Sequence, residues 1–204
     1  VGRNYHAHAI EMGAPVDKAS MQPFYFIKDA GSLVESGASL PYPPGTRDYQ
    51  HEMELVVAIG ASGFRVAEAD APSLVWGYAC GLDMTRRDLQ RVAREAGKPW
   101  DLAKNFEGAA VLSGIVPKAG ADVLQSGAIT LQVNGLTRQS GNLAQLIWSI
   151  PELIADLSRF YHLQPGDLIF TGTPEGVSAV VPGDRLTGRI EGVGEITLTI
   201  GEAE

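Results

Sequence analysis

The chain has 204 residues, a hydrophobic share of 45% and a formal net charge of −8 at pH 7. This length predicts one domain with a substantial core, and the negative charge argues against nucleic acid or an anionic membrane as a partner. No signal peptide is visible, and no apolar run approaches the ~18–20 residues of a membrane span. The single cysteine, Cys80, excludes an internal disulfide and fits a reducing cytoplasm, where it is expected to be an inert core thiol.

The N-terminal part predicts a short helix followed by loops. Because the chain starts at Val1 and not at methionine, we expect further residues before it. Residues 6–12 are predicted to form the helix, and residues 23–28 a short strand that ends on Lys28. Prolines and glycine in residues 29–50 indicate a loop-rich connection.

Residues 52–60 form the most informative predicted strand. Alternate side chains of a strand share a face, so Glu52 and Glu54 lie side by side, with Cα atoms roughly 6.5–7 Å apart, at the head of an apolar segment. Like charges at this distance repel each other and resist burial, and a hard divalent cation such as Mg²⁺, Mn²⁺ or Ca²⁺ removes both costs. The alternative is a strand end at which both glutamates point into water.

A third carboxylate follows the next apolar segment. Residues 74–82 predict a buried strand that stops at Asp83, and a helix is predicted over residues 85–96. Asp83 or Thr85 could cap this helix, with Asp88 completing a capping box from Thr85. Thr85 suffices as the cap, so Asp83 is a candidate third ligand of the same ion.

The rest of the chain predicts a mixed β fold with peripheral helices, and not a doubly wound βαβ protein. Asn134-Gly135 between apolar residues is a hairpin signal, and two Pro-Gly-Asp turns each precede a strand-like segment. Pro151 either starts a second helix or kinks one. The further predicted elements are a helix near 68–74, an irregular segment at 100–106, strands near 110–117 and 129–133, and helices over 143–150 and 151–161.

Two polar groups point to acid–base and anion chemistry. His8 and Glu11 share a helix face, where the carboxylate would orient the imidazole as a general base, although spacing alone favours a solvated pair. Lys28 and Lys104 lie at junctions, where an ammonium can balance metal-bound carboxylates or a developing oxyanion, or be an ordinary exposed lysine.

The start of the helix after Asp83 and a later turn are candidate anion sites. Arg86, Arg87 and Gln90 suit a substrate carboxylate, because arginine forms bidentate pairs, or they form a solvated helix face. Thr173 lies in the turn 171–176, whose N–H and hydroxyl groups suit an anion, unless it is a plain turn. Nucleotide-binding, zinc and hydrolase-elbow motifs are not found in the sequence.

Several short motifs occur in a fixed order along nearly the whole chain. They are Gly2-Arg3-Asn4-Tyr5 with His8 and Glu11; Phe26-Ile27-Lys28; His51-Glu52-Met53-Glu54; Gly81-Leu82-Asp83-Met84-Thr85 with Arg87-Asp88-Leu89-Gln90; Pro99-Trp100 with Lys104-Asn105-Phe106; and Gly166-Asp167 leading to Thr171-Gly172-Thr173-Pro174. Any one motif is weak, but the ordered set is specific. Together they resemble the fumarylacetoacetate hydrolase family.

The resemblance implies a fold, an ion and an assembly. The implied fold is α+β and β-rich, with a mixed β-roll or sandwich core, in a homodimer. Residues 1–204 would form one catalytic domain, with residues 1–20 as a lid that carries the catalytic pair His8 and Glu11. The implied Mg²⁺ or Mn²⁺ site, which can hold Ca²⁺ in a crystal, is formed by Glu52, Glu54 and Asp83.

The resemblance also implies the substrate contacts and the reaction. Lys104, Gln90, Arg87 and Thr173 match family positions around a bound 2-oxo acid. The implied reaction is hydrolysis of a carbon–carbon bond in a 2,4-dioxo acid. The residues of these motifs favour fumarylpyruvate as the substrate. It would be split into fumarate and pyruvate during gentisate breakdown, in the cytoplasm. Arg86 is then predicted to read the distal carboxylate, unless it faces solvent.

Other functions share parts of this pattern. An acylpyruvase, an oxaloacetate decarboxylase or a hydroxymuconate isomerase or decarboxylase of the same family would keep the metal site. A non-catalytic binder of a divalent metal and 2-oxo acids would need neither His8 nor Glu11. In the hydrolase, His8 would activate water for attack on the C4 carbonyl, and Lys28 or Lys104 would stabilise the oxyanion.

Overall fold

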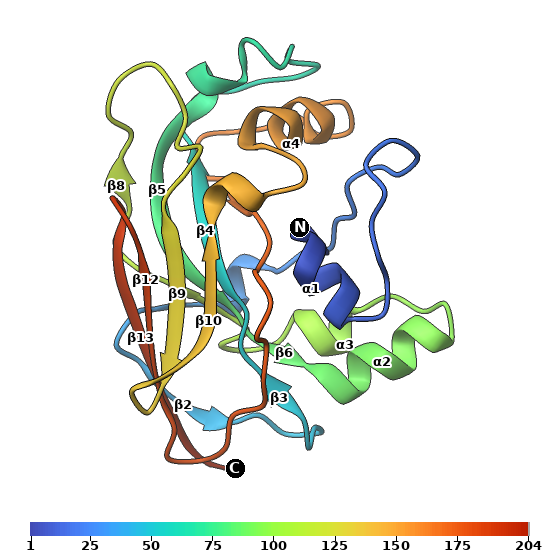
Figure 1. Cartoon of the computed structure of the whole chain (residues 1–204), viewed down its shortest axis with the longest axis vertical. Coiled ribbons are helices and arrows are strands. Elements are labelled where there is room, and N and C mark those ends of the chain that lie inside the picture. Colours follow the sequence, from blue (N-terminus) through green and yellow to red (C-terminus); the bar gives the residue numbers. More distant parts are fainter. Residues whose placement is uncertain (204) are drawn as a thin grey trace.

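The computed structural model describes residues 1–203, which form two large β-sheets with helices along one side (Figure 1). The strands of the first sheet are β1 (Leu33–Glu35), β4 (Met53–Ile59), β5 (Val75–Asp83), β7 (Ala110–Leu112), β8 (Val116–Pro117) and β11 (Leu168–Phe170). Their order is β1-β7-β5-β4-β11, with β8 also paired to β5. Only the pair β1 and β7 is parallel. The strands predicted on either side of the carboxylates are therefore confirmed as central neighbours, β4 and β5.

The second sheet contains the predicted hairpin. Its strands are β2 (Ser39–Tyr42), β9 (Ala128–Val133), β10 (Leu136–Asn142), β12 (Arg185–Ile190) and β13 (Gly194–Ala203), in the order β10-β9-β12-β13-β2. Asn134 and Gly135 connect β9 and β10 with φ angles of 52° and 79°. Two successive residues with positive φ match the tight turn that twisted hairpin strands require, so the hairpin prediction is confirmed.

The two sheets pack face to face and share one hydrophobic core. Leu55 and Leu82 of the first sheet and Leu131 of the second belong to the same buried cluster. The sheets approach closely where Gly188 of β12 faces Met53, since a Cβ atom on this glycine would lie 2.5 Å from the methionine sulfur. Side chains alternate along β4, so the glutamates flanking Met53 point away from the second sheet.

Helices cover this outer face of the first sheet (Figure 1). They are α1 (His6–Glu11), α2 (Arg87–Glu95), α3 (Asp101–Lys104) and α4 (Ile150–Leu157), with 3₁₀ turns at Ala30–Ser32, Ala71–Leu74 and Leu143–Gln145. Ser149 and Glu152 form a capping box at the start of α4, and Pro151 lies in its first turn, so this proline starts the helix. No helix among residues 1–203 is long and apolar enough to cross a membrane.

Five predicted elements differ from the structure. Residues 23–28 form no strand, and Phe24 makes only an isolated bridge to Gly2. The helix predicted from Thr85 starts at Arg87, because β6 (Thr85–Arg86) pairs with the distant β3 (Tyr49–Gln50). The segment 100–106, predicted to be irregular, contains α3, whereas the helices predicted near 68–74 and 143–150 are reduced to 3₁₀ turns and the first residue of α4.

Candidate active site

The pairing of β4 with β5 brings the three predicted carboxylates together. Met53 pairs with Leu82, and the backbone N–H of Asp83 donates to the carbonyl of Glu52 at 2.9 Å. Glu52, Glu54 and Asp83 are all buried, and one carboxylate oxygen of each lies within 4.8 Å of the others. The sequence thus predicted correctly that these groups share one face of the sheet.

The two glutamates have opposite electrostatic environments. Burial, together with the negative charges of Asp83 and Glu52, raises the pKa of Glu54 to about 8, although the Val1 ammonium and the N–H of Gly172, which donates to it at 2.6 Å, act to lower this pKa. Burial also acts to raise the pKa of Glu52, but Lys104 and Arg87 outweigh it and hold this pKa well below its usual range. Glu54 is therefore the member of the cluster that lacks a compensating positive side chain.

Lys104 connects two of the three carboxylates. It ends α3, and its Nζ donates to Glu52 and Asp83, both at 2.8 Å, and to the hydroxyl of Thr85 at 2.6 Å. Thr85 does not cap α2, since its hydroxyl donates to the carbonyl of Asp83 and α2 has no side-chain cap. The capping alternative for Asp83 and Thr85 is thereby excluded.

Arg87 and Gln90 are the buried residues of α2 and face the carboxylates. The Arg87 guanidinium donates to Glu52, to Gln90 at 2.5 Å and to Gln50 at 2.7 Å. This network fixes the Glu52 carboxylate and leaves the amide nitrogen of Gln90 free of a protein acceptor among the described residues.

Lys28 lies behind the cluster and not on the cavity wall. Its Nζ is 2.8 Å from Oδ1 of Asp83 and donates to the carbonyls of Lys104 and Ala109, at 2.5 and 2.8 Å, and of Met84 at 3.3 Å. Burial lowers its pKa, and Asp83 opposes this shift. Lys28 therefore holds Asp83 and the surrounding backbone in place, and the expectation that it reaches the reacting atoms does not match its position.

His8 and Glu11 form the predicted pair on α1. Nδ1 of His8 lies 3.1 Å from Oε2 of Glu11, whose other oxygen accepts from the N–H of Gly176 at 3.1 Å. His8 is 5% exposed and is close enough to Glu52 to contribute to its lowered pKa. The contact to Gly176 anchors α1 over the sheet, so the pair is not the solvated surface pair that spacing alone favours.

The turn after β11 holds Glu54 and the N-terminal segment together. The Thr173 hydroxyl donates to the carbonyl of Met53 at 2.8 Å and accepts from Gln139 at 2.7 Å. The side chain of Asn4 donates to the carbonyls of Thr171 and Trp148 at 2.8 and 3.0 Å. No role was predicted for Asn4, because neither its position in the sequence nor its residue type indicates this long-range contact.

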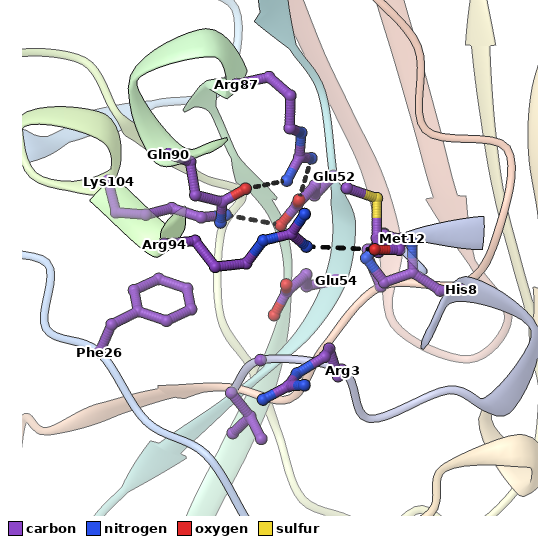
Figure 2. Close-up of a pocket in the computed structure, with 13 residues that line it drawn as sticks. Arg3, His8, Met12, Phe26, Glu52, Glu54, Arg87, Gln90, Arg94 and Lys104 are labelled. Atoms are coloured by element: carbon purple, nitrogen blue, oxygen red, sulfur yellow. Dashed lines mark hydrogen bonds and ion pairs between the residues drawn. The ribbon is translucent and has the colours of Figure 1, made fainter. Parts of the chain in front are cut away.

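A cavity of ≈ 40 Å³ lies over the carboxylates, between β4, α1 and α2 (Figure 2). The predicted residues on its wall are His8, Glu52, Glu54, Arg87, Gln90, Lys104 and Thr173. Its wall also includes Arg3, Met12, Phe26 and Arg94, which sequence reasoning missed. Arg94 could have been found, because it follows Arg87 and Gln90 at helical spacing on one face of α2. A second cavity of ≈ 660 Å³ shares Arg3, Phe26, Arg94 and Lys104 with the first.

Arg86 lies outside both cavities, in contrast to its predicted role. Its guanidinium stacks over the ring of Phe106, 4.0 Å from the ring centroid, and donates to the carbonyl of Leu102 at 3.2 Å. The cause is the β3–β6 pairing, which places Arg86 in a strand before α2 begins. Arg86 and Arg87 consequently point to different surroundings.

The residues present fit a hard divalent cation. The donor set consists of carboxylate oxygens, which Mg²⁺ and Mn²⁺ prefer. Oδ1 of Asp83 is buried without a hydrogen bond, because the nearby Lys28 ammonium directs its N–H groups elsewhere. Glu54 forms no ion pair with a lysine or arginine in residues 1–203. A cation near Glu54 and Asp83 would supply the missing charge and contacts.

A mixed β core that carries buried carboxylates beneath a His–Glu pair is an arrangement suited to a metal-dependent enzyme. The sequence matches the fumarylacetoacetate (FAA) hydrolase C-terminal family over residues 1–201. The chain belongs to this family, as its motifs indicated.

Three relatives are similar to this chain over most of its length. A fumarylpyruvate hydrolase from Ralstonia sp is 61% identical over 193 residues, which cover 95% of this chain and 100% of the relative. The crystal structure of fumarylpyruvate hydrolase from Pseudomonas aeruginosa in complex with Mn²⁺ and pyruvate has a TM-score of 0.93 and 47% identity, and the match covers 98% of this chain and 87% of that one. A mitochondrial oxaloacetate tautomerase from Rattus norvegicus is 40% identical, over 95% of this chain and 86% of the relative.

Proposed function

We propose that this protein is a divalent-metal-dependent hydrolase that splits fumarylpyruvate into fumarate and pyruvate. The observation that carries the proposal is the buried Glu52–Glu54–Asp83 cluster beneath the His8–Glu11 pair. The relatives named fumarylpyruvate hydrolase, at 61% and 47% identity, support this substrate over others of the family.

Glu52, Glu54 and Asp83 would hold Mg²⁺ or Mn²⁺. The ion, when bound, supplies a Lewis acid for the 2-oxo acid end of the substrate, where negative charge develops as the carbon–carbon bond breaks. Arg87 and Gln90 lie beside this end of the cavity, and the guanidinium and amide groups would orient the C1 carboxylate. Thr173 on the facing wall would complete this contact through its backbone N–H, because its hydroxyl proton is donated to the carbonyl of Met53.

His8 would act as the general base on water. The Glu11 carboxylate would accept a hydrogen bond from the Nδ1–H of His8, which leaves Nε2 of the imidazole to take the proton from water. The resulting hydroxide adds to the C4 carbonyl carbon, the bond between C3 and C4 breaks, and C3 of the leaving pyruvate receives a proton. One water is consumed, and fumarate and pyruvate are formed.

Lys104 is the better candidate for the oxyanion at C4. Lys104 lines the cavity, whereas the ammonium of Lys28 lies behind Asp83. The N–H groups of Lys104 already donate to Glu52, Asp83 and Thr85, so its ammonium would act through its charge. A preorganised ammonium stabilises a developing oxyanion strongly in a site from which water is excluded. Lys28 would act as a positioning residue for Asp83.

Residues 1–20 would serve as a lid over this single catalytic domain, residues 1–204. The inner cavity of ≈ 40 Å³ is far below the roughly 300 Å³ of a typical small-molecule site. Because His8 and Met12 form part of its wall, movement of α1 would open it. Closure then brings His8 to the substrate and excludes water.

The same relatives and the composition support a proposal for the setting of the enzyme. We propose a cytoplasmic homodimer that works in aromatic catabolism, in the breakdown of gentisate. Large exposed apolar side chains, such as Ile27, Leu102 and Phe160, at 67, 75 and 66% exposure, support an assembly. Light scattering coupled to size exclusion tests it, and a mass near the 21.7 kDa of one chain would contradict it.

The first experiment is to follow the loss of the fumarylpyruvate enol absorbance with Mg²⁺, with Mn²⁺ and with a chelator. Acetylpyruvate and oxaloacetate are assayed in parallel. We expect metal-dependent hydrolysis of fumarylpyruvate, lowered about 10²- to 10⁴-fold by His8→Ala because the general base is lost. His6→Ala is the control, since His6 is exposed and absent from the cavity wall. Activity on oxaloacetate alone, unaffected by His8→Ala, would contradict the hydrolase.

A further inference from the structure

Two arginines at the mouth of the inner cavity have no carboxylate partner among the residues that the structure describes. Arg94 on α2 and Arg3 in the N-terminal segment line both the inner and the outer cavity. Arg94 donates to the carbonyl of Met12 at 3.2 Å, and Arg3 lies 5.5 Å from the ring centroid of Phe24. Neither forms an ion pair within residues 1–203. Both charges are therefore available to an anionic ligand.

The outer cavity is cationic although the protein is acidic. Arg3, Arg94 and Lys98 contribute positive charge to its wall, whereas the charge of Lys104 is balanced by Glu52 and Asp83, and Asp101 is the acidic residue there. The whole chain has a net charge of −8. A concave site lined by positive charge raises the local concentration of anions, even on a protein whose net charge is negative.

Helix α2 connects this mouth to the carboxylates. Arg87, Gln90 and Arg94 lie on one face, and Figure 2 shows the three side chains directed into the same cavity. At 1.5 Å per residue, Arg87 and Arg94 are about 10 Å apart along the helix. A substrate held at its C1 end near Arg87 would extend toward Arg94, so the two arginines suit the two ends of a dicarboxylic acid.

We propose that Arg94, with Arg3 opposite it, binds the carboxylate at the far end of a dicarboxylic 2,4-dioxo acid. This inference rests on the proposed function and adds a residue that determines specificity. An arginine forms strong charge-assisted hydrogen bonds to a carboxylate, and a substrate with a methyl group at that end gains nothing from it. Arg94 thus has the role that the sequence suggested for Arg86, which is binding of the distal carboxylate.

The test compares two substrates that differ at the far end. Fumarylpyruvate carries the distal carboxylate and acetylpyruvate does not, so the ratio of their kcat/KM values isolates the contact. In Arg94→Gln we expect this ratio to fall about tenfold or more, with a further fall in Arg3→Gln/Arg94→Gln. Arg94→Lys should recover part of the ratio, because it keeps the charge and loses the bidentate geometry.

Arg91→Gln is the matched control, since Arg91 is exposed on α2 and lines neither cavity. It should keep the wild-type ratio. Turnover of acetylpyruvate by each variant shows that it is folded. Equal losses on both substrates in Arg94→Gln, with an active wild type, would overturn the role of Arg94 and leave the proposed function intact. A wild type that hydrolyses acetylpyruvate but not fumarylpyruvate would overturn both, and the two failures are thereby distinguished.

Discussion

The inner end of the cavity and its mouth differ in how their charges are balanced. At the inner end, Glu52 and Asp83 are buried and contact Lys104 at 2.8 Å each. At the mouth, Arg94 is exposed and its guanidinium donates to a backbone carbonyl and to no carboxylate of residues 1–203, and Arg3 lies over an aromatic ring. Buried charges must be paired to be tolerated, whereas a partly hydrated guanidinium is not destabilising when unpaired.

This difference separates two tasks. Pairing of the inner charges fixes the positions of the groups that would bind the reacting end of the substrate. The position of each of these groups depends on its charged neighbours. The unpaired charges at the mouth are free to meet a ligand and affect selection more than folding. Glu54 is the exception within the inner end, because burial and nearby negative charge raise its pKa to about 8 and no lysine or arginine within residues 1–203 pairs with it. Substitutions can test this division, beginning with the best-paired carboxylate.

Glu52→Gln should have the largest effect on folding. It leaves the buried Arg87 without its carboxylate partner and Lys104 with only Asp83, which costs about 3 kcal/mol or more. The pKa of Glu52 is lowered in the folded state, so its stabilising contribution is present above its ordinary pKa of 4.5 and is lost as the pH falls through the folded-state pKa. Chemical denaturation of the metal-free protein at neutral pH measures the loss. Glu68→Gln, on the exposed surface, should show no measurable change.

Glu54→Gln should separate metal binding from stability. We expect the affinity for Mn²⁺ to fall about 10- to 100-fold, and activity with it, because one oxygen ligand loses its charge. The metal-free protein should be as stable as the wild type or more so at pH 8, since ionisation of Glu54 is opposed by burial and by Asp83 and Glu52. Calorimetric Mn²⁺ titration and thermal unfolding in a chelator measure the two quantities. A variant destabilised as strongly as Glu52→Gln would show that the two glutamates are equivalent.

The effect of pH should follow from the same glutamate. Its pKa rises from 4.5 to about 8 on folding, so its contribution to stability is fully present below pH 4.5 and is lost as the pH rises toward 8. A bound cation requires the ionised form, so the apparent Kd for Mn²⁺ should rise by up to about tenfold per pH unit below 8. The Mn²⁺-induced increase in Tm should therefore be larger at pH 8 than at pH 6. In Glu54→Gln this pH dependence should be much weaker, and an undiminished dependence would assign it to another group.

The carboxylate cluster was predictable because its geometry is local. Strand alternation places Glu52 and Glu54 on one face, and an apolar segment ending at Asp83 identifies its neighbouring strand. The mixed β fold and the hairpin at Asn134-Gly135 follow from equally local signals. The signals for these features lie within short stretches of the sequence.

Other features depend on tertiary contacts and were missed. Helical spacing puts the apolar residues Leu89, Val92 and Ala96 on one side of the helix predicted over residues 85–96, which predicts a buried apolar face. On α2, Val92 is instead 61% exposed, whereas Arg87 and Gln90 are buried, because the carboxylates pair with the polar face of the helix. The position of Lys28 behind Asp83 depends on backbone carbonyls from three separate segments. Propensity and spacing contain no information about such contacts.

Arg86→Gln should have the smallest effect and most directly tests the contrast between neighbouring arginines. Its guanidinium stacks on Phe106 outside both cavities, so the ratio of kcat/KM for fumarylpyruvate and acetylpyruvate should stay within about twofold of wild type. Stability should fall by about 0.5–1 kcal/mol, the usual contribution of an exposed cation–π contact. The same assay applied to Arg94→Gln supplies the comparison. If Arg86→Gln lowered the ratio and Arg94→Gln did not, the far carboxylate would be bound on the other side of α2, and the mouth of the cavity would have to be placed there.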